Sequence, residues 1–371
     1  MPKTMRTMRL LAGWLTVALF LLFGSSWVGN IGSPWAALAL FAWLFLVIVW
    51  VAFGVVHEAE ELAHMLGEPL GTLVLTLSIV IIEVVLISAV MLGSSGSSTL
   101  ARDTMYAVLM IVLNGVVGLS LLLGGFRHYE QTYNLKGASA YLSVIIPLTI
   151  IALVLPNFTT STPDGSLARP QSLAFSLLTI ALYGVFLWLQ TGRHRGYFVT
   201  ADKPIDTEHD TQRPAATTTD TKSLSLHFGL LLLNILPIII LSKSLAKILD
   251  YGIDVAGAPK ALGGIIIAIL VFAPEGISAL IAARADRLTR AINLCLGSVA
   301  STLGLTVPAV LAISLYTGQS VLLGVPPSSI VMLMATLILS AMTFSNARTT
   351  MLEGAVHLSL FAVFVVLVFS P

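Results

Sequence analysis

The sequence predicts an all-α membrane protein with about eleven transmembrane helices. Of its 371 residues, 57% are hydrophobic and only 10% are charged, whereas soluble domains carry roughly 25% charged residues. Several uninterrupted apolar runs reach about 20 residues, the length of helix that crosses roughly 30 Å of hydrocarbon. Pores and transporters have this composition, and soluble enzymes do not. The formal net charge of +1 gives no indication of a nucleic-acid partner.

The first span follows three basic residues and resembles a signal peptide. No small-residue cleavage pattern ends it, so we expect a retained leading helix within residues 1–30. In chain order, the expected spans are residues 10–27, 35–56, 70–92, 104–125, 138–155, 170–190, 224–249, 260–283, 289–316, 326–345 and 350–369.

Lysine and arginine are unequally divided between the two faces that these spans define. Fourteen of the nineteen fall on one face. Basic residues near the ends of spans favour the cytoplasmic side, whereas acidic residues contribute little. We therefore expect a bacterial inner-membrane protein with a cytoplasmic N-terminus and an external C-terminus. The fourteen are Lys3, Arg6, Arg9, Arg127, Lys136, Arg193, Arg195, Lys203, Arg213, Lys222, Arg284, Arg287, Arg290 and Arg348.

One long polar segment, residues 191–223, divides the chain. Its Thr- and Asp-rich sequence cannot bury enough apolar surface to fold by itself, so we expect a cytoplasmic linker, with a regulatory role left open. It separates residues 35–190 from residues 224–371, and each part holds five expected spans. Because five is odd, the two sets enter the membrane from opposite sides. Inverted repeats of this kind are typical of secondary transporters.

Two apolar runs each contain a single carboxylate near the middle, Glu83 in residues 71–89 and Glu275 in residues 263–281. The runs align without a gap, so Gly71 also matches Gly263. A charged side chain at the centre of a bilayer costs from about 3 to more than 10 kcal/mol, so it normally has a function. Burial favours a protonated carboxyl group, and a bound cation repels the proton. We expect one shared site for protons and cations.

The two carboxylate helices, together with residues 292–308 (INLCLGSVASTLGLTVP), resemble the calcium:cation antiporter superfamily in its calcium/proton exchanger branch. Residues 236–249 and 273–294 are most similar to the bacterial ChaA-type antiporters. The resemblance implies a layout of one plus five plus five helices and no cofactor. It also implies alternating-access exchange of protons for Ca²⁺, Na⁺ or K⁺.

The resemblance further implies where the cation binds. It places the metal ion at Glu83 and Glu275, with polar help from Asn114, Ser298 and Ser301 on the following helices. Where many exchangers have Gly-Asn-Ala-x-Glu, this chain has IVIIE and VFAPE, so both copies lack the Asn. Calcium prefers six to eight oxygen ligands. The choice among the three cations therefore stays open.

Four other polar residues are candidates for a secondary role. Glu60 and Glu61 lie in the connection before the first carboxylate helix, where they could form a vestibule that concentrates cations or a solvated helix end. Glu353 and His357, one turn apart in the last span, could bond to each other or serve as a proton relay.

Three other functions are alternatives to cation/proton exchange. The same carboxylates suit a proton-independent exchanger or a channel. An intramembrane metal-dependent hydrolase would use His57 and His64, but these residues are seven apart, and the zinc-protease motif needs a spacing of four. An enzyme also has no need of an inverted repeat, so a secondary transporter is predicted. Its stoichiometry, direction and oligomeric state do not follow from the sequence.

Overall fold

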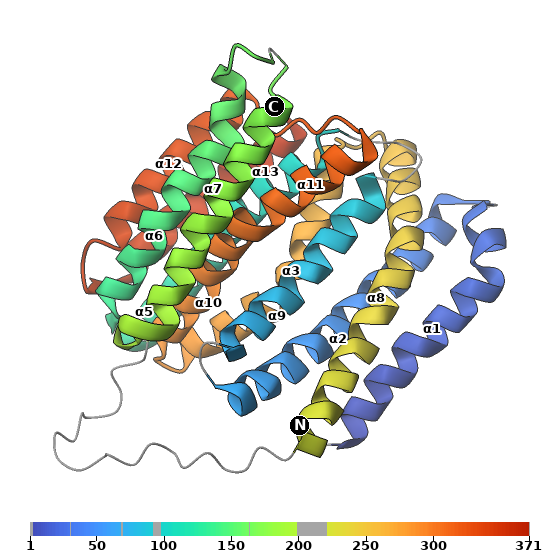
Figure 1. Cartoon of the computed structure of the whole chain (residues 1–371), viewed down its shortest axis with the longest axis horizontal. Coiled ribbons are helices and arrows are strands. Elements are labelled where there is room, and N and C mark those ends of the chain that lie inside the picture. Colours follow the sequence, from blue (N-terminus) through green and yellow to red (C-terminus); the bar gives the residue numbers. More distant parts are fainter. Residues whose placement is uncertain are drawn as a thin grey trace.

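The computed structural model describes residues 3–29, 31–67, 70–91, 98–162, 164–198 and 221–370. Within these ranges, ten helices are long and apolar enough to cross a membrane, and an eleventh apolar helix, Pro327–Thr343, has 17 residues. The predicted all-α fold with about eleven membrane helices is confirmed (Figure 1). Most of the predicted linker, residues 199–220, lies outside the described ranges.

The helices and strands follow in this order. The first repeat is preceded by α1 (Lys3–Gly29) and contains α2 (Pro34–Leu66), α3 (Leu70–Met91), α4 (Leu100–Leu109), η1 (Met110–Val116), α5 (Val117–His128), β1 (Gln131–Thr132), α6 (Leu135–Thr149), η2 (Ile150–Val154), η3 (Leu155–Phe158), α7 (Arg169–Trp188), η4 (Leu189–Arg193) and η5 (Arg195–Tyr197). The second contains α8 (Thr221–Ala256), α9 (Ala261–Arg284), α10 (Leu288–Ser301), η6 (Thr302–Thr306), α11 (Val307–Thr317), α12 (Pro327–Thr343), β2 (Arg348–Thr349) and α13 (Met351–Phe369).

Helix α2 extends well beyond the span expected at residues 35–56. It starts at Pro34, with the side chain of Ser33 accepting a hydrogen bond from a backbone N–H, and it ends at Gly67, whose φ is 65°. No helix-breaking residue interrupts the intervening sequence. The segment expected to connect two spans, residues 57–64, therefore forms the last two turns of α2.

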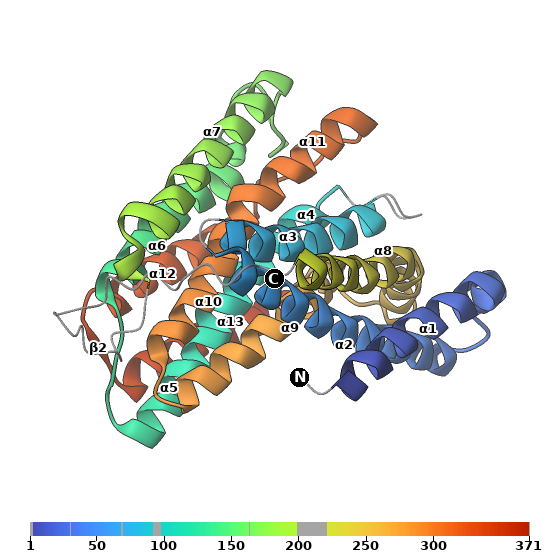
Figure 2. The same cartoon turned by 60° about the horizontal axis from the view of Figure 1, so that its bottom comes forward.

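The two repeats interlock in one bundle. Helices α2 and α8, the first of each repeat, pack closely against each other, and α1 packs against both. These three helices occupy one end of the molecule, while α6, α7 and α12 occupy the other (Figures 1 and 2). The carboxylate helices α3 and α9 lie between the two ends, where each contacts α2 and α8.

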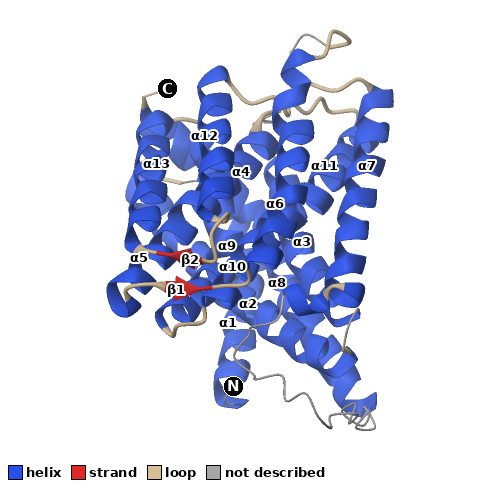
Figure 3. Cartoon of the chain, turned by 90° about the vertical axis from the view of Figure 1, so that its left-hand side faces the viewer, coloured by secondary structure: helices blue, strands red, loops and turns tan. Residues whose placement is uncertain are grey.

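The loops gather on two opposite faces. On the face that carries β1 and β2, these two strands pair antiparallel (Figure 3). There, the side chain of Gln131 donates a hydrogen bond to the carbonyl oxygen of Ala283. On the opposite face, the backbone N–H of Leu322 bonds to the carbonyl oxygen of Ser98, and that of Gly324 bonds to Gly165. We call these surfaces the β1/β2 face and the opposite face. Loops predicted to share a side of the membrane thus lie together.

The distribution of basic residues predicts that the β1/β2 face is cytoplasmic. We expect a reporter fused after Pro371 to be external and one inserted near Thr218 to be cytoplasmic, because an odd number of spans separates the N-terminus from the C-terminus. Alkaline phosphatase and green fluorescent protein fusions measure the two locations. Finding both reporters on the same side would contradict the inverted arrangement.

Candidate functional site

The two mid-helix carboxylates are brought together at the centre of the bundle. Glu83 on α3 is 1% exposed and Glu275 on α9 is 4% exposed. The two side chains lie within electrostatic range of each other. Apart from Arg284 at the end of α9, these two glutamates are the only charged residues in α3 and α9. The side-chain hydrogen bonds that one of them accepts come from another helix.

Glu83 receives two such partners from the second repeat. Its Oε2 accepts hydrogen bonds from the hydroxyls of Thr302 (3.0 Å) and Thr306 (2.8 Å), the first and last residues of η6. Its Oε1, and both carboxyl oxygens of Glu275, have no hydrogen-bond partner among the described residues. Leaving a buried polar atom without a partner is costly. Three buried oxygens are therefore available to a proton or a cation.

Thr302 and Thr306 were not among the residues predicted for the site, although a signal was present in the sequence. The offset of 192 residues that relates Glu83 to Glu275 also relates Met110 to Thr302 and Asn114 to Thr306. These positions fall in two of the π-helical segments, Met110–Val116 and Thr302–Thr306. Short π-helical segments are frequent at functional sites.

Asn114, proposed as a cation ligand, has partners on the last two helices. Its Nδ2 donates to the hydroxyl of Thr336 (2.8 Å), and its Oδ1 lies 3.2 Å from Nδ1 of His357. Nε2 of His357 in turn lies 3.0 Å from the hydroxyl of Thr343. Asn114 and His357 are both fully buried, so this chain of side chains forms a polar connection through the apolar core.

Glu353 and His357 do not form the hydrogen bond that was one of the two alternatives. The carboxylate of Glu353 accepts hydrogen bonds from the backbone N–H and the hydroxyl of Thr350. This is a capping box at the start of α13. The two residues interact electrostatically, but their hydrogen bonds go to different partners.

A cavity of about 390 Å³ leads to Glu275. It is lined mainly by α3 and α10, and its lining includes Ser298 and Ser301, whose role in cation binding stays a prediction. Its other lining residues include Arg290 in the first turn of α10 and Phe198. Both belong to segments of the β1/β2 face, so the cavity approaches Glu275 from that side.

The acidic end of α2 lies on the same approach. Glu60 and Glu61 are partly exposed, and Glu60 is within electrostatic range of Glu275. Glu58, which was not among the predicted site residues, is 1% exposed, and its carboxylate lies 2.7 Å from Nδ1 of His227. It lies on the buried side of α2 with Val55 and Ala59. The helical spacing of three and four residues could have identified Glu58 as a buried residue.

On the opposite face, α9 packs directly against the backbone of α4. A Cβ atom added to Gly264 on α9 would lie 2.6 Å from the backbone nitrogen of Thr104 on α4. The repeat-related residue, Thr72 on α3, instead lines the cavity. The two equivalent helix contacts therefore differ: the one at Gly264 is closed, and the one at Thr72 is open.

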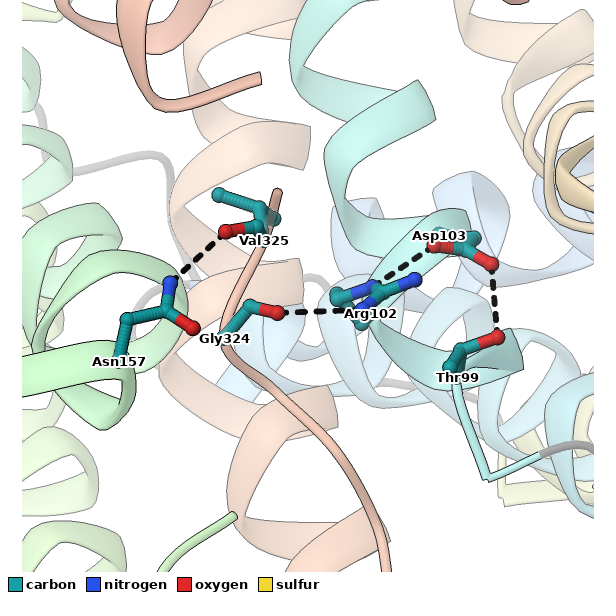
Figure 4. A network of polar contacts seen from close by, with 6 residues as sticks. All are labelled: Thr99, Arg102, Asp103, Asn157, Gly324 and Val325. Atoms are coloured by element: carbon teal, nitrogen blue, oxygen red, sulfur yellow. Dashed lines mark hydrogen bonds and ion pairs between the residues drawn. The ribbon is translucent and has the colours of Figure 1, made fainter. Parts of the chain in front are cut away.

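Polar contacts reinforce this closure around the start of α4 (Figure 4). Arg102 donates to the carbonyl oxygen of Gly324 (3.2 Å), and its Nε lies 2.8 Å from Asp103. Asp103 also accepts a hydrogen bond from Thr99 (3.0 Å). Nearby, Asn157 donates to the carbonyl oxygen of Val325 (2.8 Å). The loop before α12, which belongs to the second repeat, is thus held by two residues of the first repeat.

The family described as "Sodium/calcium exchanger protein" matches residues 36–192 and 226–370. The chain belongs to this family. Within the sodium/calcium exchanger family, the chain is similar to the sodium-potassium/proton antiporter ChaA of Escherichia coli (strain K12), with 40% identity over 86% of each chain. Because its relatives are named antiporters, this member is a secondary transporter and not an enzyme.

Solved structures share the fold. Native YfkE matches with a TM-score of 0.72 and 20% identity, covering 95% of this chain and all of that one. The H⁺/Ca²⁺ exchanger CAX matches with a TM-score of 0.66 and 17% identity, covering 97% of this chain and 88% of that one. At these identities the likeness concerns the arrangement of helices, which agrees with the predicted leading helix and inverted repeats.

Proposed function

We propose that this protein exchanges protons for a cation at a single site formed by Glu83 and Glu275. The observation that carries the proposal is the set of three buried carboxyl oxygens without a protein partner, one on Glu83 and two on Glu275, beside a cavity that reaches Glu275. A carboxyl group away from water is stable when protonated or when it binds a cation. The two ligands exclude each other, which is the requirement for coupled exchange.

Coupled exchange also requires alternating access, in which the site opens to one face of the membrane at a time. The open contact at Thr72 and the closed contact at Gly264 support assigning this conformation to a state open toward the β1/β2 face. Closing the contact at Thr72 and opening the contact at Gly264 would open the site toward the opposite face. Rocking of one repeat against the other is the usual mechanism of inverted-repeat transporters. A channel, which would be open to both faces at once, is the alternative.

Monovalent cations suit the site best. The oxygens that could coordinate a cation belong to two carboxylates and to the hydroxyls of Thr302 and Thr306. Both carboxylate motifs lack the Asn found in many exchangers. Calcium prefers six to eight oxygens. The name of the Escherichia coli relative also specifies sodium and potassium. We therefore propose Na⁺ or K⁺ as the exchanged ion, with Ca²⁺ as the alternative.

Proton flux in proteoliposomes tests this function. The purified protein is reconstituted with a pH-sensitive dye inside, and Na⁺, K⁺ or Ca²⁺ is added outside, one at a time. We expect the inward cation gradient to drive protons out of the vesicles against their own gradient, and a proton gradient to drive cations uphill. Cation flux without proton movement would indicate a proton-independent exchanger or a channel.

The two threonines on η6 should set cation affinity. We expect Thr302→Val and Thr306→Val each to raise the cation concentration for half-maximal exchange about tenfold, because each removes a hydroxyl next to a buried carboxylate, and hydrogen bonds to charged groups contribute about 1.5–3 kcal/mol. The maximal rate should change less. Thr149→Val is the matched control, since Thr149 is also fully buried and its hydroxyl has no described partner. Equal effects at all three positions would refute a role for Thr302 and Thr306.

A further inference from the structure

Arg290 occupies an unexpected place for a basic residue in a cation transporter. Among the described residues that line the cavity leading to Glu275, only Glu275 and Arg290 are charged. Arg290 lies in the first turn of α10 and is exposed. Within the described ranges, its guanidinium forms no ion pair or hydrogen bond, whereas Arg102 and Arg348 each pair with a carboxylate. Its positive charge is therefore not neutralised by a described neighbour.

A fixed positive charge on this path acts unequally on different cations. The Coulomb energy is proportional to the charge of the moving ion, so Arg290 opposes a divalent cation twice as strongly as a monovalent cation or a proton. The start of α10 adds a smaller effect of the same sign, because a helix N-terminus is partly positive. The acidic groups in range of Glu275, which are Glu83 and Glu60, attract all cations.

We propose that Arg290 is a specificity-determining residue that disfavours divalent relative to monovalent cations on the path to Glu275. This inference rests on the proposed function, since it concerns the cation that reaches the carboxylate pair. For a cation about 10 Å from the guanidinium and an effective dielectric constant of about 40, this unit charge weakens the binding of a monovalent cation about fourfold and of a divalent cation about sixteenfold. The ratio between the two therefore changes about fourfold.

The test compares Arg290→Gln, Arg290→Lys and Arg287→Gln in proteoliposomes. Arg287 is the matched control, because it is exposed and lies only three residues away but does not line the cavity. For each variant, the half-saturating concentrations of Na⁺ and Ca²⁺ are measured. We expect Arg290→Gln to shift their ratio toward Ca²⁺ about fourfold, and Arg290→Lys and Arg287→Gln to leave it near the wild-type value. The shift should shrink in high concentrations of a large, non-transported salt, which screens the charge.

Two results would overturn the inference. One is an unchanged ratio in Arg290→Gln, and the other is an equal shift in Arg287→Gln, which would indicate a general surface charge. Titration calorimetry of the detergent-purified variants with Na⁺ and Ca²⁺ gives the same ratio without transport. If wild-type protein binds both ions but exchanges neither for protons, the proposed function fails, while the binding ratio still decides the role of Arg290.

Discussion

Replacing either buried carboxylate with its amide should abolish coupled exchange. In Glu275→Gln and Glu83→Gln, the side chain keeps its size and one acceptor oxygen but loses its negative charge and its titrating proton. Both ligands should therefore be lost together, and we expect exchange rates at least a hundredfold below wild type. The fold should persist, because the substitution replaces a buried carboxyl group that has few hydrogen-bond partners in the protein. Proton flux and thermal unfolding of the purified variants measure the two effects.

The control for this substitution is Glu130→Gln. Glu130 is exposed and pairs with Arg348 on the β1/β2 face, so its loss should cost little, as is usual for surface ion pairs. Cation-driven proton movement at a wild-type rate in Glu275→Gln would rule out the shared site. If only Glu83→Gln retained exchange, the proton and cation would bind at Glu275 alone.

A substitution in the closed contact between α4 and α9 should also reduce exchange strongly. We expect Gly264→Leu to reduce exchange at least tenfold, because a Cβ at this position would lie 2.6 Å and 2.7 Å from backbone atoms of Thr104 and Asp103. Backbone atoms cannot move aside as a side chain can. Overpacking costs about 1–3 kcal/mol, and a cost of that size shifts the balance between two conformations about 5- to 150-fold.

Gly184→Leu on α7 is the matched control, because a Cβ there would meet no atom within 4 Å. It introduces the same side chain into another membrane helix, at an exposed position. Initial rates and thermal unfolding are measured for both variants. Equal activity and stability in the two variants would show that the contact at Gly264 is not required for transport.

Much of the fold could be predicted because membrane helices have a strong signal in the sequence. Apolar runs of about 20 residues must be helical in hydrocarbon, where backbone groups can bond only within the segment. The ends were harder to predict. Helix α2 continues through acidic residues to Leu66 because a helix may extend past the bilayer, and the stop is set by the backbone at Gly67. Helix α12, with 17 residues, is shorter than the span expected there.

The candidate site could be predicted only in part. The two glutamates stand out because charge is rare in apolar runs, and Ser298 and Ser301 line the cavity that reaches Glu275. Asn114 was predicted to help bind the cation; its hydrogen-bond partners lie on α12 and α13, and its role at the cation stays a prediction. Helices that are apolar on all sides show almost no preferred face, so the sequence does not indicate which neighbour a polar residue will meet.

The sequence by itself determined the number of spans, the two repeats of opposite direction and the pair of carboxylates, since each follows from where polar residues interrupt apolar runs. Only the tertiary structure decided that Thr302 and Thr306 bind Glu83 and that Arg290 shares a cavity with Glu275. It also decided that the contact at Gly264 is closed while its counterpart is open. These features depend on how helices from the two repeats pack against one another. The packing helices are about 200 residues apart in the chain, and the local pattern of either segment does not encode the distance between them.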